Sequence, residues 1–119
     1  MLVNFTNHKY EAWSDEQKSA AQKWGEVIDL PFPNVKPQAS KADVEKMAQS
    51  FSGKIISMKP CATTAQGEMT LCFAVVNRLK AAEISVFAAT SERTIIEKTD
   101  EDGNSVRTSV FKFVQFREY

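Results

Sequence analysis

A short strand pattern that passes through a glycine directly into an apolar helix constrains the fold of this chain more than any other feature. The stretch starts at Thr63, turns at Gln66 and Gly67, and continues as a helix from Glu68. Such a turn leaves the first N–H groups of the helix unpaired, at the positive end of the helix dipole and beside the carboxyl edge of a sheet. The pattern therefore favours an α/β unit and predicts a place to hold an anion.

Strand and helix patterns alternate through the rest of the chain. Ser14 with Gln17, and Ser40 with Asp43, are typical of helix starts that are capped by side chains. Gly25 is expected to end the first of these helices, and residue 53, also a glycine, the second. The expected strands are residues 2–5, 26–30, 63–65 and 84–89, and the expected helices are residues 14–24, 40–53 and 68–82.

The last third of the chain is typical of a hairpin. Residues 94–98 and 105–116 flank an acidic segment in which Asp102-Gly103 is the turn signal. Strands that alternate with helices favour a parallel sheet with right-handed crossovers. The prediction is one α/β domain over residues 1–119, a small Rossmann-like three-layer sandwich with a mostly parallel sheet and a C-terminal antiparallel hairpin.

Composition excludes several function classes. The chain has 119 residues, 43 % of them hydrophobic, which suits one ordinary core. Fifteen basic and fifteen acidic residues balance, so a footprint for duplex DNA is not expected. No stretch is long and apolar enough to span a membrane, so a cytoplasmic protein is expected. Cys61 and Cys72 have no metal-ligand spacing, so we expect two small buried residues, no metal and no cofactor.

Helix 68–82 is apolar most of the way round, which predicts that a partner subunit covers part of it, in a homodimer. Other candidate functional groups lie near the strand ends. His8 is the only histidine and follows the first strand, where it is equally consistent with an ordinary loop residue. Arg93 could bind an anion or form a solvated pair with Glu92 or Glu97. Tyr10 and Trp13 could stack on a base, but packing over the sheet edge is favoured.

Five segments together resemble a small family of CRISPR-associated proteins. These are stand-alone ring nucleases with a Rossmann-like fold, related to the nucleotide-sensing domains of type III CRISPR systems. The segments are Phe5-Thr6-Asn7-His8, Ser14-Asp15-Glu16-Gln17, Gln66-Gly67-Glu68, Ala89-Thr90-Ser91-Glu92-Arg93 and the ending from Phe111 to Tyr119. The resemblance covers most of the chain, and residues 31–60 match it poorly.

The resemblance implies a dimer that binds a cyclic oligoadenylate, with the four-membered ring expected, on its two-fold axis and cleaves it without metal. A ribose 2′-OH would attack the adjacent phosphodiester, and loss of this second messenger would switch off type III CRISPR signalling. We expect catalytic roles for His8, Glu68 and Arg93. The expected substrate-binding residues are Thr6, Asn7, Gln66, Gly67, Thr70, Thr90 and Ser91, with the N–H groups of Gly67 and Glu68 as phosphate donors.

Two other functions stay open at the level of sequence. A non-catalytic sensor or sponge would bind the cyclic nucleotide in the same cleft and leave the ring intact. A protein-interaction dimer would use the apolar helix 68–82 and would bind no nucleotide.

Overall fold

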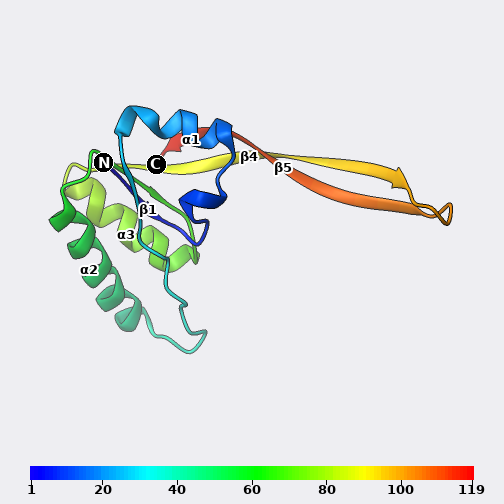
Figure 1. The fold of residues 1–119 in the computed structure, drawn as a ribbon. Helices are drawn as coiled ribbons and strands as arrows, with labels where there is room; N and C mark the ends of the chain where they lie inside the picture. The colour runs from blue at the N-terminus through cyan, green and yellow to red at the C-terminus, as the bar shows by residue number, and fades with distance from the viewer.

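The computed structural model describes residues 1–119 as one five-stranded sheet with helices on both faces (Figure 1). The strand order is β2-β1-β3-β4-β5; the first four strands run parallel and β5 runs antiparallel to β4. This confirms the expected mixed α/β fold with its C-terminal hairpin. The elements are β1 (Leu2–Phe5), η1 (Tyr10–Ala12), α1 (Asp15–Ala21), η2 (Gln22–Trp24), β2 (Val27–Asp29), α2 (Lys41–Met58), β3 (Ala62–Ala65), α3 (Met69–Ala81), β4 (Ser85–Thr99) and β5 (Ser105–Glu118).

The central strands β1 and β3 are buried along their whole length because both faces of the sheet are covered. Helices α2 and α3 cover one face, where Val3 and Phe5 pack with residues such as Ile55 and Val75. Helix α1 covers the other face, where Leu2 packs with three residues: Trp13, Ala21 and Ala62. Successive side chains of β1 thus enter opposite cores, as the pleat of a strand requires.

The start of α2 is the capping box expected at Ser40 and Asp43, with both reciprocal bonds formed. The expected end at Gly53 is wrong, because the helix continues to Met58. Gly53 lies on the exposed side, and the cost of about 1 kcal/mol for a helical glycine is outweighed by burial of the next turn, where Ile55 is fully buried. The helix ends at Lys59, which has a left-handed backbone and precedes Pro60.

The first helix starts as expected, since the Ser14 hydroxyl accepts from the Gln17 N–H. It ends in the 3₁₀ turn η2 before Gly25, the residue expected to end it, which has a φ of 82°. Trp13 is buried and packs beside Tyr10 and Phe116, so the packing role favoured for these aromatic residues is confirmed.

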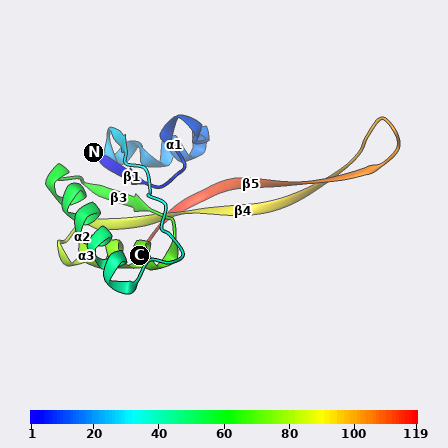
Figure 2. The same ribbon diagram turned by 90° about the horizontal axis from the view of Figure 1, so that it is seen from below.

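Strand β4 was expected to end at Ala89, but it runs on to Thr99. It pairs with β5 along this length, and the two strands leave the body of the molecule as a long arm (Figures 1 and 2). We call residues 91–113 the arm. The turn at its tip is the expected one, with Gly103 at a φ of 81° and the Asp100 carboxylate accepting from two backbone N–H groups.

Only one of the two cysteines is buried as expected. Cys72 is buried, as predicted, but Cys61 is exposed, because it lies before β3, where the chain enters the sheet from the surface. No helix of this chain has the length and apolar character needed to cross a membrane.

The apolar surface of α3 is mostly covered by the chain itself. The sheet and α2 bury Leu71, Val75 and Leu79, so the amount of apolar surface left for a partner is smaller than expected. Met69 and Phe73 are the exceptions, with 83 % and 71 % of their surface exposed.

Candidate functional site

A hollow of about 680 Å³ lies at the carboxyl ends of β3 and the parallel part of β4, on the face that α1 covers. In α/β folds, ligands bind at this edge of the sheet. We call it the His8 hollow. Its lining residues are His8, Ala12, Ser14, Glu16, Gln17, Gln66, Ala89, Ser91, Val110, Phe111, Lys112 and Phe113.

His8 enters the hollow from the loop after β1 and is exposed. Its Nε2 lies 3.3 Å from the carbonyl oxygen of Ala12. A carbonyl only accepts, so this contact assigns the proton of a neutral ring to Nε2 and leaves Nδ1 as an acceptor. The backbone of His8 is held by other groups, because its carbonyl oxygen accepts from Trp13 Nε1 at 2.9 Å and from Asn4 Nδ2 at 2.8 Å.

Thr6 serves the same loop. Its hydroxyl donates to Asn4 Oδ1 at 2.8 Å and accepts from the His8 N–H at 3.1 Å. Asn4 is fully buried in β1 and also donates to Asp29 Oδ1. The observed contacts of Thr6 therefore position the His8 loop, while Asn7 is exposed and has no side-chain hydrogen bond. Sequence reasoning missed Asn4 and Asp29; the polar Asn4 inside an apolar strand was the available signal.

Gln66 joins β3 to β4 through its side chain. The amide nitrogen donates to the carbonyl oxygen of Ala89, and the amide oxygen accepts from the N–H of Ala89, both at 3.0 Å. These bonds extend the sheet by one rung beyond the end of β3. The side chain borders the hollow, but both ends of its amide are engaged by the backbone.

The base of the arm forms the opposite wall of the hollow. A bulge in β5 disturbs the register between Thr90 and Ser91, and bulges redirect the side chains beside them. Phe113 and Phe111 line the hollow with Lys112 and Ser91, while the Thr90 hydroxyl donates to the Gln115 carbonyl. No role was expected for Phe111 or Lys112 from the sequence, beyond their place in the C-terminal segment of the resemblance.

Glu68 caps the helix that it precedes. Its carboxylate accepts from the backbone N–H groups of Thr70 and Leu71, and also from the Thr70 hydroxyl. These hydrogen bonds lower the pKa of Glu68, and the bond from the Leu71 N–H has the largest effect. The protein's own carboxylate therefore occupies the N–H groups of Thr70 and Leu71, where the sequence predicted an anion.

Gly67 is required by packing. A Cβ at this position would lie 2.5 Å from the ring of Phe32, which is buried and stacks on Phe5 with ring centroids 4.7 Å apart. Phe32 comes from the proline-flanked loop after β2. A side chain at residue 67 would displace this ring, whether or not a ligand binds nearby.

Arg93 lies on the arm, outside the hollow. Its guanidinium donates to the Ser109 hydroxyl on the opposite strand, through Nε at 3.3 Å and Nη2 at 3.1 Å. Arg93 pairs in the ladder with Phe111, which does line the hollow. The structure thus brings His8, Gln66 and Ser91 together, and it does not bring Arg93, Glu68 or Thr70 into the same hollow.

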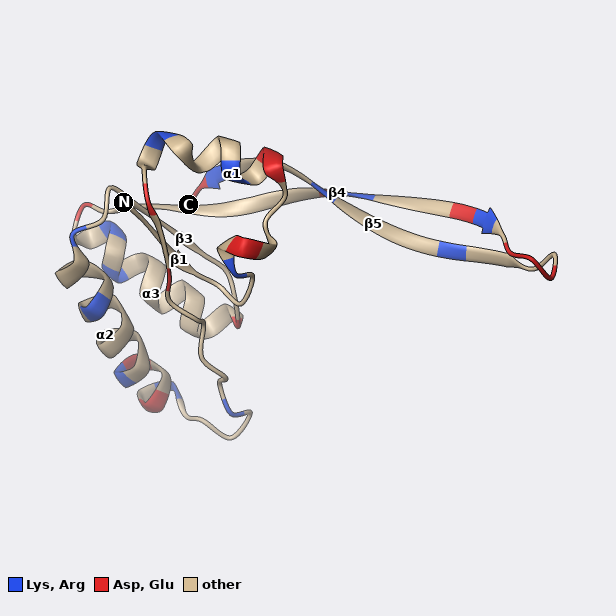
Figure 3. Ribbon diagram, viewed as in Figure 1, with Lys and Arg blue, Asp and Glu red and all other residues tan.

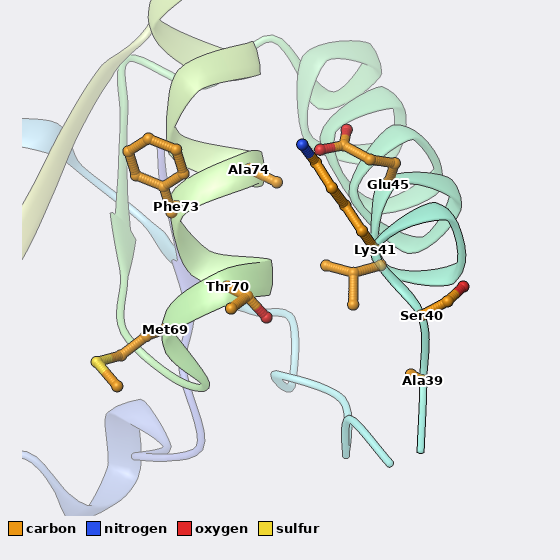
Figure 4. Close-up of a pocket in the computed structure, with 9 residues that line it drawn as sticks. Ala39, Ser40, Lys41, Glu45, Met69, Thr70, Phe73 and Ala74 are labelled. Atoms are coloured by element: carbon orange, nitrogen blue, oxygen red, sulfur yellow. The ribbon is translucent and has the colours of Figure 1, made fainter. Parts of the chain in front are cut away.

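A second, larger hollow of about 800 Å³ lies between the N-terminal ends of α2 and α3 (Figure 4). It is lined by the exposed Met69 and Phe73, with Thr70 from α3 and Lys41 and Glu45 from α2. This groove is mostly apolar and contains one predicted site residue, Thr70.

Charge is dispersed over the molecule, with a run of acidic residues at the tip of the arm (Figure 3). Lys112 is the cation of the His8 hollow, and Glu16 of α1 is its carboxylate. No group of three or more His, Cys, Asp and Glu side chains lies close enough together to hold a metal ion.

Residues 1–117 match the family described as the Uncharacterized protein MJ1673 family. This chain belongs to the MJ1673 family. No curated protein and no solved structure gives a significant match. In this member of the MJ1673 family, the chemistry of the His8 hollow therefore has to carry the functional argument.

Proposed function

We propose that this protein binds a cyclic oligoadenylate, with the four-membered ring as the expected substrate, in the His8 hollow and cleaves it to linear products. The observation that carries the proposal is the combination of groups there: the imidazole of His8, the ammonium of Lys112 and the rings of Phe111 and Phe113. Aromatic rings stack on bases, and an ammonium neutralises phosphate. The resemblance of five segments to ring nucleases supports the same substrate.

In the proposed reaction, a ribose 2′-oxygen attacks its neighbouring phosphorus. A new P–O2′ bond forms, the P–O5′ bond breaks, and the products end in a 2′,3′-cyclic phosphate and a 5′-hydroxyl. His8 Nδ1 takes the proton from the 2′-OH, the leaving 5′-oxygen takes a proton from water, and the protonated His8 returns its proton to the hydroxide that forms. Holding the 2′-oxygen in line contributes several kcal/mol. Lys112 stabilises the charge that grows on the non-bridging oxygens.

The other catalytic residues expected from sequence have secondary roles in this proposal. Glu68 holds the N-terminus of α3 and does not take a proton, because the bonds that lower its pKa make it a weak base. Arg93 contributes by orienting the arm strand that carries Phe111. Gln66 fixes the edge of the hollow through Ala89.

The test is incubation of the purified protein with cyclic tetra-adenylate in EDTA, with products resolved by chromatography and mass spectrometry. We expect linear products with a cyclic phosphate end. His8→Ala should lower turnover at least about a hundredfold, as loss of a general base does. Lys9→Ala is the matched control: residue 9 is the exposed neighbour of His8, does not line the hollow and should leave turnover within a few-fold.

If the ring stays intact and bound to the protein, the protein is a sensor or sponge and not a nuclease. Intact ring that does not bind would contradict the nucleotide proposal for this ligand. A loss of less than a few-fold in His8→Ala would remove His8 from the chemistry and leave it a positional role only.

A further inference from the structure

The arm has two faces, which follow from the register of β4 and β5. Residues that pair across the strands share a face, and faces alternate along each strand. One face, the Phe111 face, carries Arg93, Ile95 and Glu97 of β4 opposite Phe111, Ser109 and Arg107 of β5. The other, the Ile96 face, carries Glu92, Thr94, Ile96 and Lys98 opposite Lys112, Val110, Thr108 and Val106.

The centre of the Ile96 face is apolar and β-branched and has no cover in the chain. Ile96, Val110 and Val106 keep 39 %, 41 % and 45 % of their surface exposed, with Thr94 and Thr108 between them. Val110 also borders the His8 hollow. A two-stranded ribbon is marginally stable in water unless it packs on something. This surface has the composition of a sheet face that packs on another sheet.

The charged side chains of the two faces differ in whether they have a partner within the chain. On the Phe111 face, Arg107 pairs with Glu97 at 3.1 Å and Arg93 donates to Ser109. On the Ile96 face, neither Glu92 nor Lys98 forms an ion pair within the chain, whose salt bridges are Arg78 with Glu45 and Arg107 with Glu97. The Ile96 face therefore has an apolar centre, with Glu92 and Lys112 opposite each other near its base and Lys98 near its tip, none of them in an ion pair.

We propose that the Ile96 face binds the same face of a second copy of this chain, with the two arms antiparallel about a two-fold axis. In this arrangement β4 lies over the partner's β4 with its direction reversed. Glu92 then faces Lys98 of the partner subunit, and Thr94 faces Ile96 of the partner subunit. Each pair occurs twice, and Lys112 faces Val106 of the partner subunit. A self-complementary order of this kind is what an isologous interface requires.

The interface is small. Two ribbon faces of this length bury about 1,000 Å² in total, at the lower end of specific interfaces. The dimer should therefore form in the micromolar range, and it should weaken as salt screens the opposite charges of Glu92 and Lys98 across the interface.

Lys112 and Val110 of the Ile96 face also line the His8 hollow, so this interface passes beside the hollow, while Phe111 and Phe113 lie on the other face of each arm. The two-fold axis of this dimer crosses the middle of the arm, and each copy keeps its own hollow. That differs from the single ring on a two-fold axis which the resemblance implies.

Sedimentation velocity on the full chain tests the proposal through a pair of neighbouring substitutions. Ile96→Lys places a charge in the interface and should raise the dimer dissociation constant at least about a hundredfold. Ile95→Lys is the matched control, because Ile95 is the next residue along, is more exposed at 48 % and lies on the Phe111 face. It should leave the dissociation constant within about threefold.

Charge exchange tests the antiparallel register. Glu92→Lys alone, or Lys98→Glu alone, brings like charges together twice and should weaken the dimer about tenfold. The double exchange restores opposite charges across the two-fold axis and should return the dissociation constant to within about threefold of the unchanged protein. A monomeric unchanged protein, equal effects of Ile95→Lys and Ile96→Lys, or no recovery in the double exchange would each overturn the proposal.

Discussion

At the N-terminus of α3, the Glu68 carboxylate accepts from the N–H groups of Thr70 and Leu71, while the phosphate donors expected from the sequence were the N–H groups of Gly67 and Glu68. The Glu68 carboxylate accepts hydrogen bonds from two backbone N–H groups and from the Thr70 hydroxyl. The strand, glycine turn and helix are therefore present as expected, and the helix N-terminus holds a carboxylate of the chain itself. Sequence could place a carboxylate at this turn; it could not tell a cap from a catalytic base, because the difference lies in side-chain conformation.

The cap has a consequence for the pH dependence of stability. The pKa of Glu68 is lower in the folded protein than in the unfolded chain, so its carboxylate stabilises the fold above its unfolded pKa. This stabilisation is lost as the pH falls through the folded pKa. Glu68→Gln should therefore be less stable than the unchanged protein at pH 7, and the difference should shrink toward about pH 3.

Urea denaturation at the two pH values measures this difference. Glu26→Gln is the control, since Glu26 is exposed and its side chain forms no hydrogen bond or ion pair in the structure. A constant difference between Glu68→Gln and the unchanged protein at both pH values would show that the carboxylate does not act as the cap.

At the scale of elements, local patterns predicted those parts of the fold whose information is local. Strand β1, the capping box of α2, the helix α3 and the Asp102-Gly103 turn all follow from residues within a few positions of one another. The length of β4 does not follow from local patterns. Glu92 and Arg93 looked like the end of a strand, but a ribbon that is exposed on both faces accepts charged residues, so β4 continues with β5 as its partner.

Two glycines illustrate the same difference between local sequence patterns and contacts from distant parts of the chain. Gly67 faces the buried ring of Phe32, which comes from a distant loop, while Gly53 lies in α2 with nothing within 4 Å of the place of a Cβ. Gly67→Ala should lower the unfolding free energy by about 1–3 kcal/mol, because the ring has to move. Gly53→Ala should raise it by about 0.4–1 kcal/mol, because alanine favours the helix.

Thermal unfolding of the two variants beside the unchanged protein is sufficient to compare them. If Gly67→Ala were as stable as the unchanged protein, the close packing between Phe32 and the turn would not be present in solution.

At the scale of the whole molecule, the His8 hollow is assembled from four separate parts of the sequence. His8 follows β1, Gln66 follows β3, Ser91 lies in β4, and Phe111 comes from the returning strand of the arm. Sequence reasoning grouped the first three because they follow neighbouring parallel strands. It gave no role to the aromatic wall, because the position of β5 over this edge depends on a bulge and on a hairpin more than twenty residues long.

The most direct test of the central claim is to locate the bound ligand on the protein. Cyclic tetra-adenylate with methylated 2′-hydroxyls has no nucleophile and should bind without being cleaved. In nitrogen–proton correlation NMR spectra, we expect addition of this analogue to shift the backbone amide signals of four residues that line the hollow: His8, Ser91, Phe111 and Phe113. Shifts confined to Met69, Phe73 and their neighbours in the groove between α2 and α3, or no shifts at all, would contradict the assignment of the His8 hollow.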